Sequence, residues 1–473
     1  MRTRAVVLAS AMILLAALGL GGWVAYDEGL LDPSAGEPQR TAGAELPPPP
    51  GVSVPEVAPP GPVLEQTSAS TATRRGMRTE LADELRADDL GPSLGVLVED
   101  LASGDELLRH GRGRFTPAST LKLLTAVAVL EQLGPEHRFS TTVVAGRRPG
   151  EIVLVGGGDP LLARRATTAA YPDPATTQQL ARRTAKALAA DGTTRVRLRY
   201  DASLFTGPAV NPAWEPSYVP DQVVTPISAL WVDEGLGPDG AGPRATEPAR
   251  AAAEVFADQL EAEGIVVRGR VTPREAPAEA QRLASVESPP LARIVGHVLQ
   301  LSDNEGAEVL LRHVALAAGR PASFEGGVQA LTETLAGLGI DLSHARILGG
   351  SGLARGNRLP LDVLVDTLRV AAQPEHPELR AAVSRLPVAG FSGSLAYRFA
   401  ADGESPSDPA LGVVRAKTGT LTGVHALAGV ILDQEGAALL YVAIADQVRP
   451  QDTLDARAAL DDLSAAIATC GCG

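Results

Sequence analysis

The chain has 473 residues, which is enough for two or three domains of ordinary size. Its formal net charge of −14 excludes the basic footprint of a nucleic-acid-binding protein, so no nucleic-acid partner is expected. Hydrophobic residues make up 45% of the chain and aromatic residues only 3%, so the core must consist mainly of alanine, valine and leucine.

The N-terminus starts with the basic MRTR and continues with 22 uncharged residues, AVVLASAMILLAALGLGGWVAY. This run is long enough to span a bilayer, and Trp23 and Tyr26 fall where aromatic residues meet the membrane interface. Arg2 and Arg4 favour a cytoplasmic N-terminus. Residues 1–27 are therefore predicted to be an uncleaved signal anchor, with cleavage and secretion as the alternative. In either case the rest of the chain is expected outside the cytoplasm.

A proline-rich segment follows, with the run ELPPPPGVSVPEVAPPGPVLE inside residues 28–75. Proline at this density favours extended polyproline II and cannot build a core. The segment is therefore predicted to be a semi-rigid linker that holds the folded body away from the membrane.

From about residue 76 onwards, hydrophobic patterning predicts alternating strands and helices. The first part has a hairpin around SGD and a helix with Ser119 in its first turn and Gly134 at its end. A buried hairpin around QEG and a final helix close the chain. The other expected elements are the strand-like segments FSTTVVAG, EIVLVGGGDP and RVRLRYD, and helices at about 175–190 and 246–263.

Two motifs could suggest a cofactor or a metal. GGGDP at 156–160 lacks the third spaced glycine of a dinucleotide fingerprint and the GK[ST] of a P-loop, so it is interpreted as a tight turn. Cys470 and Cys472 are the only cysteines, and two thiols in a frayed tail are a poor metal site. We therefore expect an idle tail, no disulfide framework, no metal and no cofactor.

Lysine occurs only at Lys122, Lys186 and Lys417, whereas the other 39 of the 42 basic residues are arginines. Arginine stays protonated in proteins, but a buried lysine can lose its proton and act as a base. Ser119 precedes Lys122 by three positions, so both side chains share one face of a helix. Taken alone, this pair also fits a surface lysine beside a capping serine. Lys186 has no special neighbours and is expected on a solvated helix face.

The other two blocks that accompany Ser119-x-x-Lys122 are S-D-N at 302–304 and K-T-G at 417–419. In this order, the three blocks are typical of penicillin-binding proteins and class A β-lactamases. Two of the three lysines fall within them, which favours a catalytic interpretation of Ser119 and Lys122 over the surface alternative.

Each residue of the first two blocks suits a step of acyl transfer. Ser119 is the expected nucleophile, and its backbone N–H can help to bind an oxyanion. Lys122 would take the hydroxyl proton if burial depresses its pKa. Ser302 can relay a proton towards the leaving amine, and Asn304 can hold the substrate's amide. Lys122→Arg is therefore expected to abolish acylation and to leave the fold intact.

The third block is expected to bind substrate. Lys417, with the hydroxyls of Thr418 and Thr420, offers a cationic site for a carboxylate. Gly419 would let the substrate backbone approach the strand closely, and the backbone N–H of Thr420 would be the second oxyanion donor beside that of Ser119.

From about residue 80 to 465 the chain resembles the D-alanyl-D-alanine carboxypeptidases/endopeptidases of the low-molecular-mass class C penicillin-binding proteins, of the peptidase S13 type. Besides the three blocks, the resemblance rests on TPASTLKLLTA, LVGGGDPLL, the GP-x-x-x-P-x-W run around Trp214, TPISAL, GGSGLARGNRLP and LPVAGFSGSLAYR. It implies an α/β (α+β) catalytic domain of the serine β-lactamase/transpeptidase type, in two parts at 76–140 and 284–473. A mixed α/β domain at 141–283 would be inserted between them.

One segment departs from the family pattern. Where such proteins usually carry D-G-S-G-L-S-R, this chain has GGSGLAR at 349–355, so Gly349 replaces the acid and Ala354 the second serine. The motif near the site therefore differs in charge, while the three blocks are intact.

The resemblance implies a serine D-alanyl-D-alanine carboxypeptidase that acts on peptidoglycan stem peptides through an acyl-enzyme. Endopeptidase cleavage of cross-links is a close variant, and β-lactams would acylate Ser119. One alternative is a serine β-lactamase, although no E-x-x-L-N-like segment supplies a base for deacylation. Another is a non-catalytic cell-wall-binding protein that retains the fold. A Ser-His-Asp hydrolase is disfavoured, because the chain has no G-x-S-x-G elbow.

Overall fold

The structure is a computed structural model that describes residues 69–473, except 168–170, 238–241 and 400–405. The predicted anchor at 1–27 and most of the predicted linker lie outside the described residues. Residues 66–473 form one compact unit. Among the described helices, none has the length and apolar character needed to cross a membrane.

The last residues of the predicted linker are attached to this unit. The backbone N–H of Ser70 donates to Asp100 Oδ2 at 2.7 Å, and its hydroxyl donates to Asp433 Oδ2 at 2.7 Å. Helix α2 (Arg74–Glu80) then begins inside the range assigned to the linker, capped by the side chain of Thr73.

A five-stranded antiparallel sheet has the order β2-β1-β11-β10-β9. It confirms both predicted hairpins, because β1 pairs with β2 around SGD and β10 pairs with β11 around QEG. β1 also pairs along its whole length with β11, at the other end of the chain. The strands are β1 (Ser93–Asp100), β2 (Glu106–His110), β9 (Val414–Leu421), β10 (Val424–Leu432) and β11 (Ala438–Asp446).

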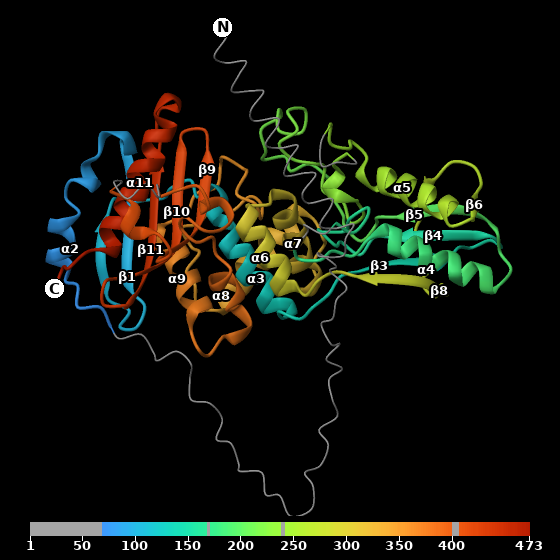
Figure 1. Cartoon of the computed structure of the whole chain (residues 1–473), viewed down its shortest axis with the longest axis horizontal. Coiled ribbons are helices and arrows are strands. Elements are labelled where there is room, and N and C mark those ends of the chain that lie inside the picture. The colour runs from blue at the N-terminus through green and yellow to red at the C-terminus, as the bar shows by residue number, and fades with distance from the viewer. Residues whose placement is uncertain (1–68, 168–170, 238–241, 400–405) are drawn as a thin grey trace, which may run out of the picture. The chain divides into compact units, whose positions relative to one another are not determined.

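Helices cover both faces of this sheet, and β10 and β11 are therefore almost continuously apolar and buried. Leu440 and Val442 of β11 face one core, whereas Leu439 and Tyr441 face the other. Helices α2 and α11 (Thr453–Ala468) cover the second face (Figure 1). The helices on the first face are α3 (Lys122–Leu133), α6 (Leu291–Leu301), α7 (Asn304–Ala317), α8 (Phe324–Gly337), α9 (Leu361–Ala372) and α10 (Ala381–Ser384).

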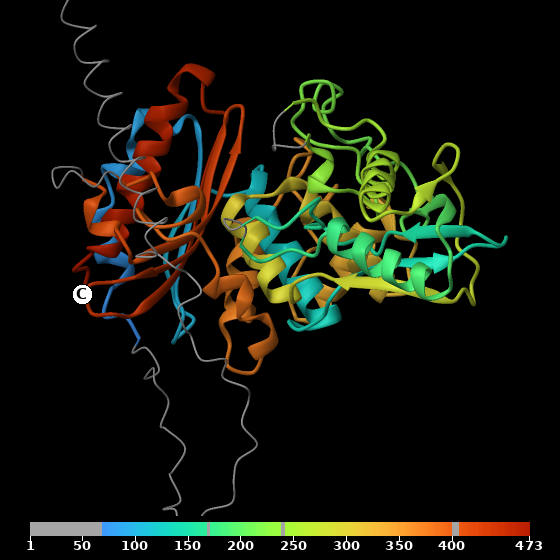
Figure 2. The same cartoon turned by 45° about the vertical axis from the view of Figure 1, so that its right-hand side comes forward.

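A second, mixed sheet lies beyond this helical layer, as Figures 1 and 2 show. Its order is β6-β5-β4-β3-β8, and β7 also pairs with β5. The boundaries expected at 141 and 283 fall within its strands β3 and β8. Its elements are β3 (Ser140–Ala145), β4 (Glu151–Val155), α4 (Thr177–Ala190), β5 (Arg195–Asp201), α5 (Pro248–Ala262), β6 (Val266–Val267), β7 (Thr272–Pro273) and β8 (Arg282–Glu287).

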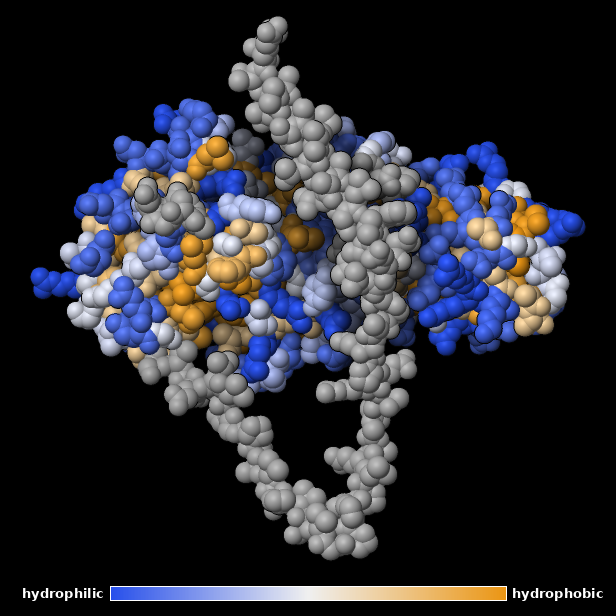
Figure 3. All heavy atoms as spheres, viewed as in Figure 1, coloured by the Kyte–Doolittle hydropathy of each residue, from blue (hydrophilic) through white to orange (hydrophobic). Residues whose placement is uncertain are grey.

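Helix α4 shows how this part separates its core from solvent. Leu180 and Ala181 are buried in the core of the second sheet, whereas Arg182 and Lys186 are exposed. The expected solvated position of Lys186 is thereby confirmed. In the view of Figure 3, hydrophilic residues cover much of this end, and hydrophobic residues gather in a patch over the end that carries the five-stranded sheet.

The C-terminal tail packs against α2, so the expectation of an idle, frayed tail is wrong. Cys470 and Cys472 are buried and joined by a disulfide. The carbonyl oxygen of Cys472 accepts hydrogen bonds from the backbone N–H of Thr73 at 2.8 Å and from its hydroxyl at 3.0 Å. Gly76 permits this approach, because a Cβ at that position would overlap the same carbonyl.

Short 3₁₀ turns complete the described elements, at Glu84–Arg86, Asp88–Leu90, Ala118–Leu121 (η3), Asp233–Gly235 (η4), Pro377–Leu379, Gly393–Leu395, Asp408–Ala410 and Pro450–Asp452.

Candidate active site

Ser119 lies on the 3₁₀ turn η3, which leads directly into α3. The preceding Ala118 has a φ of 47°, a value that side-chain-bearing residues adopt only under constraint. Thr116 provides one constraint, because its backbone N–H donates to Asp446 Oδ2 at 3.0 Å and ties the segment to β11. Gly352 provides another, because its backbone packs directly on Ala118. The turn is therefore held from two sides.

Lys122 is fully buried at the start of α3, and its amine has three neighbours. Nζ lies 2.9 Å from Ser119 Oγ, 2.8 Å from Asn304 Oδ1 and 2.6 Å from the carbonyl oxygen of Ser351. Two of these neighbours can only accept a hydrogen bond, whereas the hydroxyl can also donate. A neutral amine satisfies all three, because it donates twice and offers its lone pair to Ser119.

Burial shifts the equilibrium of Lys122 towards this neutral form. Burial lowers the pKa of its ammonium to about 8 from the usual 10.5, although the carboxylates of Asp303, Glu308 and Glu305 act in the opposite direction. The desolvation of a fully buried amine therefore outweighs three nearby negative charges.

The S-D-N block forms the corner between α6 and α7. Ser302 adopts the left-handed conformation with φ 58° and ψ 35°, and Asp303 caps α7 by accepting from the backbone N–H of Gly306 at 2.8 Å. Asn304 is the first residue of α7, and its Oδ1 faces Lys122. Asn304 thus positions the amine as well as lining the cavity, a contact between residues 182 positions apart that no sequence motif indicates.

The K-T-G block lies on β9, the edge strand of the five-stranded sheet. Lys417 is fully buried, and its Nζ donates to the carbonyl oxygen of Thr418 at 2.9 Å and to its hydroxyl at 3.3 Å. Burial, with repulsion from Lys122 as the second cause, holds the pKa of Lys417 well below 10.5. The hydroxyl of Thr418 also contacts Ser394 Oγ at 2.7 Å.

Packing within the protein requires a glycine at position 419, independently of any substrate. A Cβ at this position would lie 2.8 Å from the carbonyl oxygen of Pro117 and 3.0 Å from Ala426 Cβ. The missing side chain thus allows β9 to pack against the turn that carries Ser119. The expected close approach of the substrate backbone at Gly419 stays a prediction.

These groups meet at a cavity of about 440 Å³. Lys122 and Lys417 lie buried behind its wall. Two lining residues, Tyr218 and Val223, come from the loop after β5, and no motif of known spacing marks them. The lining residues are Ser119, Tyr218, Val223, Ser302, Asn304, Leu353, Thr418, Thr420, Leu421 and Thr422. The structure therefore brings Ser119, Ser302, Asn304, Thr418 and Thr420 to one cavity, and the roles assigned to them stay predictions.

Glu308 on α7 holds the altered GGSGLAR segment in place through hydrogen bonds. Its buried carboxylate accepts from the backbone N–H of Gly350 at 2.9 Å and of Ser351 at 3.0 Å, and also from the Ser351 hydroxyl. A Cβ at Gly349 would lie 2.8 Å from Glu308 Oε1, so this carboxylate already occupies the space beside position 349. Burial raises the pKa of Glu308. Glu308 thus holds the loop whose Ser351 carbonyl contacts Lys122.

Comparisons with known proteins show the family to which the chain belongs. The sequence profile of the D-Ala-D-Ala carboxypeptidase 3 (S13) family matches residues 77–241 and 237–467. A protein named carboxypeptidase DacB from Mycolicibacterium smegmatis is 37% identical over 451 residues, which cover 93% of each chain. A D-alanyl-D-alanine carboxypeptidase from an Actinomadura species is 30% identical over 461 residues, which cover 78% of this chain and 82% of that protein.

A solved structure confirms the mixed α/β fold. The crystal structure of penicillin-binding protein 4 from Haemophilus influenzae aligns with a TM-score of 0.67 and 22% identity. The alignment covers 82% of this chain and 98% of that chain. The same protein has also been solved in complex with a β-lactam.

Proposed function

We propose that this chain, which belongs to the D-Ala-D-Ala carboxypeptidase 3 (S13) family, is a serine carboxypeptidase with Ser119 as its nucleophile. The observation that carries this proposal is the 2.9 Å contact between Ser119 Oγ and the fully buried Lys122 Nζ. A neutral Lys122 would accept the hydroxyl proton while Ser119 Oγ attacks the carbonyl carbon between the two terminal D-alanines.

The remaining steps use the other residues of the cavity. The backbone N–H groups of Ser119 and Thr420 would stabilise the oxyanion, and Ser302 would pass a proton to the departing D-alanine amine. Water would then hydrolyse the ester on Ser119 and regenerate the hydroxyl. Endopeptidase cleavage of a cross-link requires the same steps with a larger leaving group.

Lys417 would bind the substrate's terminal carboxylate. Its buried amine has two oxygen neighbours, both on Thr418, and no carboxylate contact is recorded for it among the described residues. A bound carboxylate would supply the missing negative charge and would favour the protonated form of Lys417. Thr418 and Thr420 would add hydroxyl donors from the exposed edge of β9.

β-Lactams are the expected inhibitors, since penicillin-binding protein 4 of H. influenzae, which has the same fold, has been solved with one bound. The lining of the cavity favours a penicillin-binding protein over a β-lactamase. None of the described residues that line it carries a carboxylate that could activate water for rapid deacylation.

The proposal also places the catalytic unit outside the cytoplasm, where peptidoglycan is found. The uncharged run near the N-terminus and the proline-rich linker support an anchored form. Membrane fractionation, with intact mass of the purified chain, would distinguish an anchored chain from one cleaved and secreted.

Intact mass of residues 66–473 after incubation with penicillin tests the catalytic proposal, with Ser119→Ala as the control. We expect one penicilloyl group per chain, persistent over time and absent from the control. Penicillin hydrolysis without an adduct would favour the β-lactamase alternative. No adduct and no hydrolysis would favour the wall-binding protein. Release of D-alanine from a pentapeptide would then establish carboxypeptidase action.

A further inference from the structure

Three side chains of types that can bind a metal lie close together beside the S-D-N block. Glu234 comes from η4, His297 from α6, and Asp303 from the corner between α6 and α7. One ligand atom of each lies within 4.8 Å of the other two. Two segments of the chain, η4 and the end of α6 with the corner after it, therefore bring a carboxylate, an imidazole and a second carboxylate together.

Two polar atoms at this point lack an ordinary hydrogen-bond partner among the described residues. Asp303 Oδ2 and His297 Nδ1 are both buried and make no hydrogen bond of ordinary geometry, although Asp303 Oδ1 caps α7 and Glu234 lies close enough to share a proton with Asp303. A buried polar group without a partner costs about 1–3 kcal/mol, so such atoms call for an explanation. The two carboxylates of Glu234 and Asp303 also repel one another unless a proton or a cation lies between them.

The nearby arginine does not serve Glu234 and Asp303. Glu234, Asp303 and Glu305 are close enough to interact electrostatically, and Arg244 is the facing cation. Arg244 is already paired with Glu305 through its guanidinium. Arg244 is therefore not free to pair with Glu234 and Asp303, whose neighbouring carboxyl groups need either a cation or a shared proton between them.

The donor set and the access path indicate the kind of cation. One imidazole nitrogen with two carboxylates suits zinc and related first-row ions, whereas calcium and magnesium prefer oxygen ligands throughout. Glu234 and His297 also line a cavity of about 350 Å³, which gives an ion a route of entry and room for a water ligand. Thr225 fixes the turn of Glu234, since its hydroxyl donates to the Glu234 carbonyl at 2.7 Å.

We propose that Glu234, His297 and Asp303 form a binding site for one divalent cation of the zinc type. This differs from the absence of metal expected from the sequence, where no spacing links the three residues. Asp303 lies between Ser302 and Asn304, so the cation would also hold the corner that presents these two residues to the active-site cavity.

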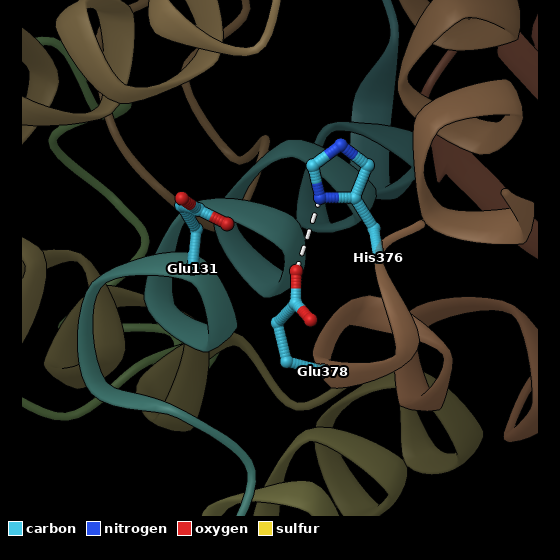
Figure 4. A group of neighbouring side chains, drawn as sticks. All are labelled: Glu131, His376 and Glu378. Carbon is cyan, nitrogen blue, oxygen red and sulfur yellow. Dashed lines mark hydrogen bonds and ion pairs between the residues drawn. The ribbon is translucent and has the colours of Figure 1, made fainter. Parts of the chain in front are cut away.

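A second histidine and glutamate group provides a matched control. Glu131, His376 and Glu378 also bring their ligand atoms within 4.8 Å of one another (Figure 4). There, however, His376 Nδ1 already pairs with Glu378 Oε1 at 3.0 Å, as the dashed line in Figure 4 shows, and Glu131 is exposed. This group is an ordinary ion pair near the surface, and no zinc site is expected at it.

Calorimetric titration of zinc chloride into the full chain tests the proposal. The chain is purified without a histidine tag in mild detergent, stripped with a chelator and dialysed. We expect one zinc ion per chain, with affinity reduced at least about tenfold by His297→Gln and by Glu234→Gln. His376→Gln should leave the affinity unchanged. Circular dichroism of each variant without metal confirms that it is folded.

Several outcomes would overturn the site. One is that the chain binds no zinc, which is expected if Glu234 and Asp303 share a proton instead. The others are an unchanged zinc affinity in both ligand variants and a loss of affinity confined to His376→Gln. X-ray absorption at the zinc edge adds a direct readout, with nitrogen and oxygen ligands expected. Since no step of the test measures catalysis, its result is independent of the proposed carboxypeptidase activity.

Discussion

Gly352 and Ala118 pack so closely that no side chain fits between them: a Cβ at position 352 would overlap the carbonyl oxygen of Ala118 and lie 3.2 Å from the backbone nitrogen of Ser119. Gly352 also has a φ of 87°, which favours glycine. The loop that Glu308 holds at Gly350 and Ser351 is thus packed directly against the turn that carries Ser119.

Gly352→Ala should therefore both weaken the fold and displace Ser119. Overpacking costs about 1–3 kcal/mol, and the left-handed backbone adds to that cost. Gly337→Ala is the matched control, because a Cβ at that helical position has no atom within 4 Å. The midpoint temperature of thermal unfolding and the rate of penicillin acylation should both fall in Gly352→Ala and not in Gly337→Ala. Equal effects in the two variants would contradict the packing argument.

Lys122→Arg and Lys122→Met should both lose acylation, by about 10²–10⁴-fold, because neither side chain can take a proton at neutral pH. The two should differ in stability. Lys122 is fully buried with three close neighbours, so the larger guanidinium should lower the free energy of unfolding by about 1–3 kcal/mol, while the fold is still expected to form. Methionine matches the volume of lysine better. Stopped-flow acylation and chemical denaturation of both variants would measure the two effects separately.

The rate of acylation should depend on the protonation of Lys122, whose pKa is about 8. Because the base must be neutral, the acylation rate constant should rise as pH increases and level off above about pH 8. A rate that is flat between pH 6 and pH 9, measured with a β-lactam that is stable over this range, would argue against Lys122 as the base.

Glu308→Gln should move the midpoint of that pH profile downwards. The carboxylate of Glu308 raises the pKa of Lys122, so its removal leaves desolvation with less opposition. Glutamine keeps the size of the side chain and an oxygen that can accept from Ser351. Glu333→Gln, which removes an exposed carboxylate on α8, should leave the midpoint in place. An upward shift, or equal shifts in the two variants, would contradict the electrostatic role of Glu308.

Local patterns allowed several elements to be predicted from the sequence. RVRLRYD coincides with β5 because its alternation is strong and its ends are marked by turns. Gly134 ends α3 with a φ of 78°, as a helix-terminating glycine should. The three blocks also identified residues that meet at one cavity, because their chemistry requires particular residue types at short spacings.

The features that could not be predicted from the sequence depend on contacts between segments that are far apart in the chain. Glu308 is 42 residues from Gly350, and Lys122 is 182 residues from Asn304, so no local pattern relates them. Gly419 is explained by the packing of β9 on η3, and the sequence could not distinguish this from an approach by substrate. The disulfide-linked tail was missed for the same reason, since its partner Thr73 lies at the other end of the folded unit.

The pairing of β1 with β11 has a consequence for the timing of synthesis. β1 is made early, but its inner edge has no partner until Ala438–Asp446 has left the ribosome. Ser119, the proposed nucleophile, likewise has no complete site until Lys417 and the edge strand β9 have been made. A nascent chain that ends before residue 438 should therefore take up no penicillin. The activity would therefore appear only once the chain has been made as far as β11, so an unfinished copy would be inactive.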